Sequence, residues 1–313
     1  MKYYLTFAAS AAALSMAASA QAQSTSTVDQ DGSLNVVEVD QNNSNEVTIT
    51  QVGDENFVDA DQTGIANGNV ASIEQIGGNL NSAFVREFGL NSRAEVFQID
   101  GADNNNTVVT QGERTDGSLA IITQTGFTGG GDNNRAVAAQ EKAVTTTIFQ
   151  DGNNNQADSR SEGVGTLSDI VQAGVNNRAT IRQFADADGS SSAVFQGGLG
   201  GTGNVAEVNQ NGSVGSSSTV GQSGGSNNTA DVLQAGDGND SFVEQGRVAG
   251  GDDNLAELDQ LGADNVSTIN QNILTAGGTN TATVTQFSDG NVSSVTQEGA
   301  NNTATVTQGS API

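Results

Sequence analysis

Side-chain amides recur along this chain at a fixed spacing, and their type and spacing point to one kind of chemistry. The clearest copy runs from Asn302 to Gln308, with Ala304 and Val306 at the alternate positions between them. Because strand side chains alternate with a period of two, all four side chains point to one face of a β-strand. Each amide can donate and accept hydrogen bonds, so copies stacked in register can form ladders of amides.

The same pattern returns along almost the whole chain. Its closing residues stand at positions 30, 41, 51, 62, 75, 87, 98, 111, 124, 140, 150, 161, 172, 183, 196, 210, 222, 234, 245, 260, 271, 286, 297 and 308. All 24 are Gln except Glu87 and Ser161, and the residue six places earlier is Asn in 17 copies and Ser in five. A seven-residue strand thus alternates with a short connection, which is typical of a repeat architecture.

The residue four places before the closing residue divides the strands into two classes. From position 157 onward Ala and Ser alternate there without a break: Ala157, Ser168, Ala179, Ser192, Ala206, Ser218, Ala230, Ser241, Ala256, Ser267, Ala282, Ser293 and Ala304. A coil whose successive strands lie on opposite walls explains this alternation, whereas an antiparallel meander gives no reason for it. We therefore predict an all-β fold, a β-solenoid of about 12 two-strand turns with two parallel walls and Asn and Gln ladders.

The predicted solenoid fills residues 23–308 without a second domain, and residues 309–313 form a short C-terminal tail. The predicted ladder residues, structural in role, are Gln172, Asn177, Gln183, Asn204, Gln210, Asn228, Gln234, Asn239, Gln245, Asn254, Gln260, Asn265, Gln271, Asn280, Gln286, Asn291, Gln297, Asn302 and Gln308. Strands 144–150 and 155–161 depart most from the pattern, and we expect local fraying there. Glu87 takes a Gln position and is expected to face inward.

Residues 1–22 have the features of a secretory signal peptide. Lys2 supplies a positive start, an apolar run follows to Ala18, and small residues offer a cleavage site at Ala20 or Ala22. The apolar run is short for a membrane span. We expect export, an extracellular location and no membrane insertion.

The composition limits the partners of the chain. Asp and Glu number 36 against 10 Lys and Arg, a formal net charge of −26. This charge argues against nucleic acid, whose binding needs basic patches, and against anionic membrane surfaces. We expect acidic residues in connections and on outward faces to restrain edge-to-edge pairing until export. The chain has no Cys, so its stability must come from backbone pairing and packing.

Other functions fit the sequence less well. Paired carboxylates could serve a polysaccharide lyase or hydrolase, but the chain has no His and few aromatic residues. The acidic turns at 129–132 and 250–253 resemble calcium-binding nonapeptides only loosely, because they do not repeat. We therefore predict no enzyme and assign no catalytic, metal-binding or cofactor-binding residue.

The open alternative is a monomeric secreted β-solenoid, either an adhesin or an ice-binding or other surface-binding protein. Its motivation is a block of threonines expected on one wall: Thr281, Thr283, Thr285, Thr303, Thr305 and Thr307. The block ends at the preceding member of the same wall, where Leu255, Glu257 and Asp259 take the same places.

These repeats resemble the curlin repeat of curli amyloid fibres, whose pattern is Ser-x5-Gln-x-Gly-x2-Asn-x-Ala-x3-Gln. The segment 166–183 fits with Gln172, Gly174, Asn177, Ala179 and Gln183, with Thr in place of the first Ser. The segment 216–234 fits with one extra turn residue. The resemblance covers roughly residues 24–308, although the chain has more repeats than known curlin subunits.

The resemblance implies a structural subunit of extracellular, cell-surface amyloid fibres. It further implies self-assembly into a homopolymer, a nucleator subunit, secretion through an outer-membrane pore, and a matrix role in adhesion and biofilm. From the residues alone, solenoid ends of matching chemistry favour head-to-tail stacking by the edge strands.

Overall fold

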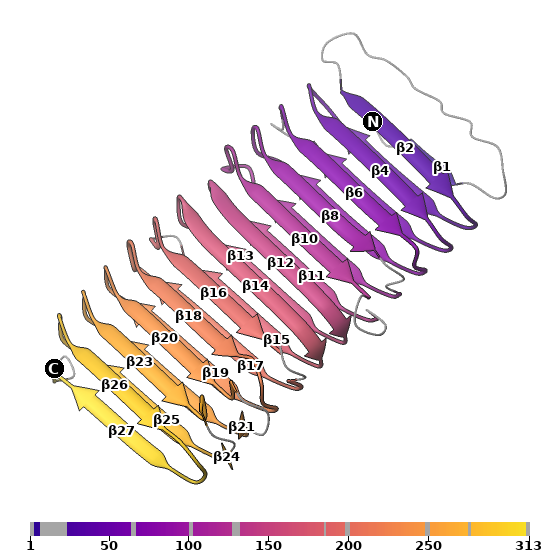
Figure 1. Ribbon diagram of the computed structural model, residues 1–313. Helices are drawn as coiled ribbons and strands as arrows, with labels where there is room; N and C mark the ends of the chain where they lie inside the picture. The colour runs from indigo at the N-terminus through magenta and orange to yellow at the C-terminus, as the bar shows by residue number, and fades with distance from the viewer. Residues whose placement is uncertain are drawn as a thin grey trace. The chain divides into compact units, whose positions relative to one another are not determined.

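The computed structural model describes residues 3–6, 24–63, 67–99, 103–126, 132–184, 186–197, 201–247, 251–274 and 277–310. Within these ranges the secondary structure consists of strands, with no helix. The contacts group into two compact units, Met1–Asn154 and Asn155–Ile313. Each unit is a two-wall β-solenoid (Figure 1). The predicted fold class is confirmed, with about 11 turns of coil where we expected 12.

In the first unit, consecutive strands alternate between two parallel walls. One wall, here the β3 wall, holds β3 (Val36–Gln41), β5 (Phe57–Gln62), β7 (Ser82–Glu87), β9 (Asn106–Gln111) and β11 (Arg135–Gln140). The other, the β2 wall, holds β2 (Thr25–Asp31), β4 (Glu46–Val52), β6 (Val70–Ile76), β8 (Arg93–Ile99), β10 (Leu119–Thr125) and β12 (Val144–Asn153). Closing residues pair with closing residues, as Gln98 does with Gln124.

Only one part of the predicted signal peptide lies within the described residues. It is β1 (Tyr3–Thr6), which pairs antiparallel with β3. The rest of residues 1–22 lies outside them, so the signal peptide stays a prediction.

The second unit has the same construction and shows the Ala/Ser division directly. Its Ala wall holds β13 (Gln156–Ser161), β15 (Arg178–Gln183), β17 (Val205–Asn211), β19 (Thr229–Ala235), β22 (Leu255–Gln260), β25 (Thr281–Gln286) and β27 (Thr303–Gln308). Its Ser wall holds β14 (Thr166–Val175), β16 (Ser191–Gln196), β18 (Ser217–Gln222), β20 (Asp240–Gln245), β23 (Val266–Gln271) and β26 (Val292–Gln297). Ala206 pairs with Ala230, and Ser218 with Ser241, in parallel register.

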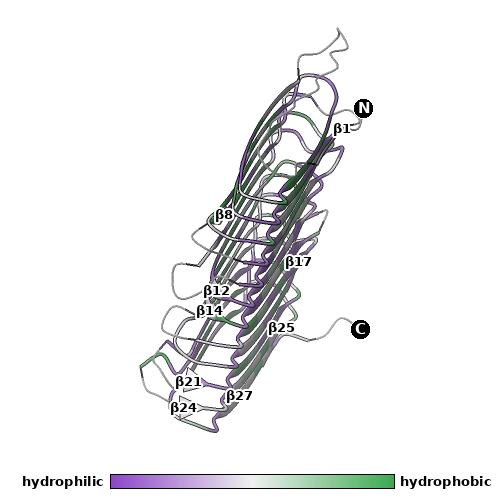
Figure 2. Ribbon diagram, turned by 90° about the vertical axis from the view of Figure 1, so that its right-hand side faces the viewer, coloured by the Kyte–Doolittle hydropathy of each residue, from purple (hydrophilic) through white to green (hydrophobic). Residues whose placement is uncertain are grey.

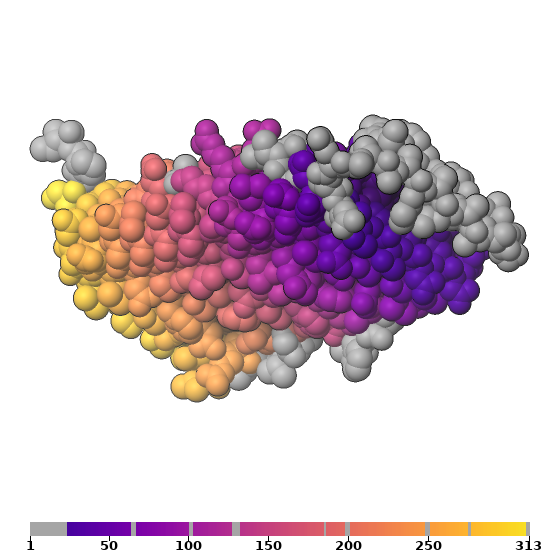
Figure 3. Space-filling model, turned by 90° about the horizontal axis from the view of Figure 1, so that it is seen from above, coloured from indigo at the N-terminus to yellow at the C-terminus, as the bar shows by residue number. Residues whose placement is uncertain are grey.

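A short parallel pair of strands lies in the connections of the second unit, β21 (Gly251–Asp252) with β24 (Gly277–Gly278). Within each unit the turns follow one another in chain order, as the colour gradient of Figure 3 shows. This order is what a coil requires, because each wall strand pairs with the next strand of the same wall.

The core of each unit lies between its two walls. Inward positions carry Val, Ile and Ala, and Ile73, Val96, Val208 and Ile269 are all 0% exposed. Figure 2 shows hydrophobic residues along the strands and hydrophilic residues in many of the turns. A buried aliphatic side chain contributes about 1.5–3 kcal/mol, so each turn adds a small increment to the stability of the fold.

Most turns place one residue with positive φ directly before the Asn that starts the next strand. In the first unit the residues with this conformation include Glu55, Leu80, Asn104 and Asn133, and in the second Asn176, Asn227, Asp253, Thr279 and Asn301. Asn tolerates the left-handed region better than other non-Gly residues, which explains the recurring Asn-Asn pairs. The N–H of this residue bonds the turn below, as Asn227 N does to Thr202 O at 2.9 Å.

The expected fraying near residues 144–161 is not found. β12 and β13 are continuous strands, and Thr146 and Ser159 are 0% exposed. In β13 small hydroxyls take over the hydrogen bonds, because Ser159 Oγ donates to Ser168 Oγ at 2.8 Å and Ser161 Oγ to Gln183 Oε1 at 2.8 Å. The boundary between the two compact units nevertheless falls between these strands.

Candidate assembly site

Gln side chains form continuous hydrogen-bonded ladders inside both walls of the second unit. In the Ser wall, Nε2 of each Gln donates to Oε1 of the Gln in the next turn at 2.8 Å: Gln172 to Gln196, Gln196 to Gln222, Gln222 to Gln245, Gln245 to Gln271 and Gln271 to Gln297. In the Ala wall the distances are 2.8–3.0 Å: Gln183 to Gln210, Gln210 to Gln234, Gln234 to Gln260, Gln260 to Gln286 and Gln286 to Gln308. Every bond points the same way along the chain.

The β2 wall of the first unit carries a ladder of the same direction. It runs from Gln30 to Gln51, Gln75, Gln98, Gln124 and Gln150, with distances of 2.5–2.9 Å. In the β3 wall, Gln41 bonds Gln62 at 2.8 Å and Gln111 bonds Gln140 at 2.9 Å, with Glu87 between these two pairs.

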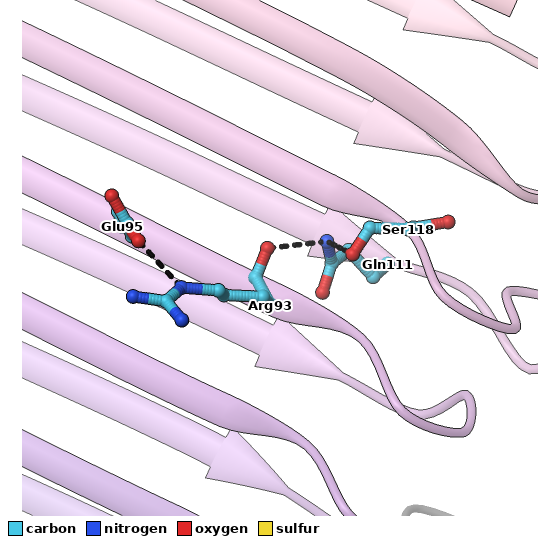
Figure 4. Close-up of polar contacts among 4 residues, drawn as sticks. All are labelled: Arg93, Glu95, Gln111 and Ser118. Carbon is cyan, nitrogen blue, oxygen red and sulfur yellow. Dashed lines mark hydrogen bonds and ion pairs between the residues drawn. The ribbon is translucent and has the colours of Figure 1, made fainter.

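In the second unit, another N–H bond from each ladder Gln ties the two walls together. Gln234 Nε2 also donates to Ser217 O on the opposite wall at 2.8 Å. In the first unit Gln111 Nε2 donates to Arg93 O at 3.1 Å, while the Arg93 side chain pairs with Glu95 at 2.5 Å (Figure 4). A buried amide without partners costs about 1–3 kcal/mol, and this arrangement uses both N–H groups of the amide.

The Asn residues bond differently from what the sequence predicted. We expected Asn side chains to bond their copies, but Asn204 Oδ1 accepts from the backbone N–H of Asn228 at 3.0 Å, and Asn204 Nδ2 donates to Gly225 O in the turn at 3.0 Å. Asn has one methylene fewer than Gln, so its amide stays near the backbone and organises the turn. Direct Asn–Asn side-chain bonds do occur, as from Asn302 to Asn280 at 3.0 Å.

All nineteen predicted ladder residues lie at inward or turn positions of the second unit. The Gln residues form the two ladders: Gln172, Gln183, Gln210, Gln234, Gln245, Gln260, Gln271, Gln286, Gln297 and Gln308. The Asn residues stand at strand starts: Asn177, Asn204, Asn228, Asn239, Asn254, Asn265, Asn280, Asn291 and Asn302. Gln196 and Gln222 complete the Ser-wall ladder, and Ser216 Oγ takes an Asn place by accepting from Asn239 N at 3.1 Å.

A second column of acceptors in the turns was not predicted. In the first unit Asp54 Oδ1 accepts from Ser33 N at 2.7 Å, Asn79 Oδ1 from Asp54 N at 2.8 Å, and Asp103 Oδ1 from Asn79 N at 2.7 Å. The hydroxyl and N–H of Ser33 hold the pKa of Asp54 below its usual value. The sequence signal is an Asp or Asn two places before the ladder Asn.

Carboxylates stack on the outer face of the Ala wall. Glu207 pairs in register with Asp231, and Asp231 with Glu257. Partial burial, and then the charges of Glu207, Asp259 and Glu257, raise the pKa of Asp231, and burial and Glu257 raise the pKa of Asp259. At one end of this column of carboxylates, Arg182 offsets the negative charge through an ion pair to Glu207 at 2.5 Å.

The Thr block of the alternative hypothesis is present on the two last strands of the Ala wall. Thr281, Thr283 and Thr285 pair in register with the three threonines of β27. The neighbouring strand β22 presents Leu255, Glu257 and Asp259 at these places. The block therefore spans two strands of this wall.

The ladders end at edge strands. β26 and β27 have a strand partner on one side only among the described strands. Ala282 and Val284 in β25 are 0% exposed, whereas Ala304 and Val306 in β27 are half-buried. Gln297 and Gln308 each donate one N–H to the opposite wall, at 2.9 Å in both cases, and no described residue accepts the other N–H.

The opposite kind of edge occurs in the first unit. β2 pairs only with β4, and every second side chain of β2 is exposed. Gln30 donates to Gln51, so its Oε1 faces the open side of the ladder, and no described residue donates to it. One edge thus offers amide N–H groups and the other offers an amide oxygen.

No group of three or more His, Cys, Asp or Glu among the described residues could hold a metal ion. The acidic turns at 129–132 and 250–253 lie partly outside the described residues. The described part of the chain also has no helix that is long and apolar enough to cross a membrane.

The geometry defines a repeat protein of the parallel two-wall β-solenoid class. The family model of the Curlin associated repeat matches residues 43–77, 251–287 and 277–309. The chain is therefore a curlin-repeat protein, as the resemblance of its repeats predicted. No curated protein gave a match to the chain.

Proposed function

We propose that this chain is a structural subunit of extracellular curli-like amyloid fibres, which grow by edge-to-edge stacking of solenoid turns. The observation that carries the proposal is the common direction of the Gln ladders. The edge formed by β26 and β27 presents unused amide N–H groups, and the edge at β2 presents an amide oxygen. Stacking one copy on the next would satisfy both, together with the unpaired backbone groups of the edge strands.

Curlin repeats and the solenoid fold fit a curli-like structural protein. On this basis we further propose secretion to the cell surface, with an outer-membrane pore and a nucleator subunit as partners. The fibres would support adhesion and the biofilm matrix. The same support favours a structural role over an enzymatic one.

The second candidate is a monomeric secreted solenoid that binds a surface through the Thr block of β25 and β27. The two strands of threonine in register favour it. Glu257 and Asp259 on the adjoining strand argue against this candidate, because a flat binding array would need threonine on further strands.

Fibre formation by purified residues 23–313 separates the two candidates. Thioflavin fluorescence and electron microscopy, with and without preformed seeds, should show seeded growth of unbranched fibres. Aligned fibres should give a reflection at about 4.7–4.8 Å from strand spacing. A chain that stays monomeric at high concentration and gives no such reflection would refute the fibre proposal and leave the monomeric binder.

A further inference from the structure

Glu87 interrupts the Gln ladder of the β3 wall at a buried position. It closes β7, faces the core and is 0% exposed. Gln62 Nε2 donates to Glu87 Oε2 at 2.5 Å, so this oxygen takes the place of the Oε1 of a ladder Gln. The other oxygen, Oε1, therefore occupies the place from which Nε2 donates in the other rungs.

The next rung shows what is missing. Glu87 pairs in register with Gln111 of β9. Gln111 donates onward to Gln140, so its own Oε1 points back toward Glu87. Glu87 Oε1 and Gln111 Oε1 are both buried, and neither has a hydrogen-bond partner. At this step of the ladder both side chains therefore offer an oxygen, whereas every regular rung offers a donor to an acceptor.

We propose that Glu87 is a proton-binding site, in which Oε1 carries the proton of a neutral carboxylic acid and donates it to Gln111 Oε1. One O–H then replaces the amide N–H of a Gln, and the rung is complete. Ionisation releases this proton to water and leaves a carboxylate facing a carbonyl oxygen in a dry interior. Such an unpaired buried charge is strongly unfavourable.

The surroundings of Glu87 favour the neutral form. The inward neighbours on the adjoining strands are the amides of Gln62 and Gln111, which carry no charge. The charged residues on the strands packed around it take outward positions: Asp59, Asp61, Glu74, Arg86, Arg93 and Glu95. Burial, partly offset by the bond from Gln62, raises the pKa of Glu87 to about 8.

The linkage between proton and fold has a definite sign. The folded chain keeps a proton on Glu87 that the unfolded chain loses above its ordinary pKa of 4.5. Stability therefore falls as pH rises from about 4.5 to about 8 and levels off above that value. Over this window the contribution of Glu87 changes the unfolding equilibrium constant by up to about tenfold per pH unit.

The test compares residues 23–313 with Glu87→Gln, which restores the residue of the regular rungs, and with Glu74→Gln, which removes one charge at an outward position of β6. Difference infrared spectra at pH 7 should show the C=O band of a protonated acid in the parent chain and in Glu74→Gln, but not in Glu87→Gln. In urea unfolding, the stability gained by Glu87→Gln should grow between pH 5 and 8, while the effect of Glu74→Gln should not follow this profile.

Either of two results would overturn the proposal. One is a parent chain that shows no protonated-acid band at pH 7, or a band that remains in Glu87→Gln. The other is a stability difference between Glu87→Gln and the parent chain that does not change from pH 5 to 8. Both readouts concern the single chain, so they are independent of fibre formation.

Discussion

At the scale of single residues, the interior of this protein contains buried side-chain amides that need hydrogen-bond partners. Gln234 is fully buried, receives from Gln210, donates to Gln260 and also donates to Ser217 O. Burying a polar group is costly unless it is hydrogen-bonded, so each Gln stabilises the fold only because its neighbours are also Gln. Repetition is thus a physical requirement of the ladder.

Replacing one ladder Gln should lower the free energy of unfolding by more than its own hydrogen bonds contribute, because two neighbouring Gln residues lose a partner. In Gln234→Leu the donor group of Gln210 and the acceptor of Gln260 lose their partners inside the core. We expect a loss of roughly 2–4 kcal/mol in the free energy of unfolding, from two unsatisfied groups that are partly offset by the apolar side chain. Urea unfolding of the single chain measures it.

The matched control is Gln156→Leu, the same change at an outward, half-buried position of β13. It should alter stability by less than about 0.5 kcal/mol, as surface substitutions usually do. Equal losses in the two variants would show that the buried ladder has no special role.

At the scale of elements, each strand depends on a turn that places one residue in the left-handed region. Asn227 has φ 56° and directly precedes the ladder residue Asn228. Its N–H donates to the carbonyl oxygen of Thr202 in the preceding turn. A β-branched residue is a severe outlier at such a φ, whereas Gly adopts it freely.

Asn227→Val should therefore destabilise the chain by about 1–2 kcal/mol, while Asn227→Gly should stay close to the parent. Thr229→Val, two residues later at the half-buried start of β19, introduces the same side chain without the strained φ. Denaturation midpoints of the three variants give the comparison. Similar midpoints for Asn227→Val and Thr229→Val would contradict the role of the turn.

The carboxylate column on the Ala wall makes a second element-scale prediction. Because the pKa of Asp231 is raised, the folded chain holds this proton more tightly than the unfolded chain. The stability from this group is full at low pH and is lost as pH rises through the folded pKa. Asp231→Asn should thus stabilise the chain at pH 7, and the gain should shrink at high salt and vanish near pH 3.

Asp240→Asn, on the outer face of the Ser wall beside uncharged Ser217 and Val266, serves as the control. Its effect should lack this dependence on pH and salt. If both variants respond alike, repulsion within the column is not the cause.

At the scale of the whole molecule, the sequence predicted the fold through its spacing. The unbroken Ala157 to Ala304 alternation predicted two parallel walls, and the second unit has them. The inward position of the Gln side chains was predicted because they alternate in step with the aliphatic residues of the same strand face. The Asn bonds did not, because residue type alone does not say whether a short amide reaches its copy or the backbone.

Two other features also escaped prediction for physical reasons. The order of β13 goes with hydrogen bonds from Ser159 to the Ser168 hydroxyl and from Ser161 to the Gln183 amide oxygen, and spacing in the sequence does not reveal these partners. The acceptor column of Asp54 and Asp103 lies in turns of uneven length, where alignment by strands gives no register. Its signal, Asp or Asn two places before the ladder Asn, becomes clear once the strand starts are known.

The proposed self-assembly rests on how the ladders end. β27 follows β26 in the coil as β3 follows β2. In the described structure β1 pairs with the other side of β3. The contact therefore requires removal of the predicted signal peptide, which contains β1, and one copy could then present both edge strands to the matching pair of the next copy. Gln308 would then donate to Gln41, and Gln297 to Gln30. Such a contact would be heterologous and would not close, so it would generate a filament.

Solid-state NMR on fibres grown from an equal mixture of ¹⁵N-labelled and ¹³C-labelled copies tests this contact directly. Stacking with the ladder direction preserved predicts correlations between the side-chain nitrogen of Gln308 and the side-chain carbonyl carbon of Gln41, and between those of Gln297 and Gln30. Fibres that lack both correlations, or that show like edges in contact, such as Gln308 with Gln308, would contradict the account.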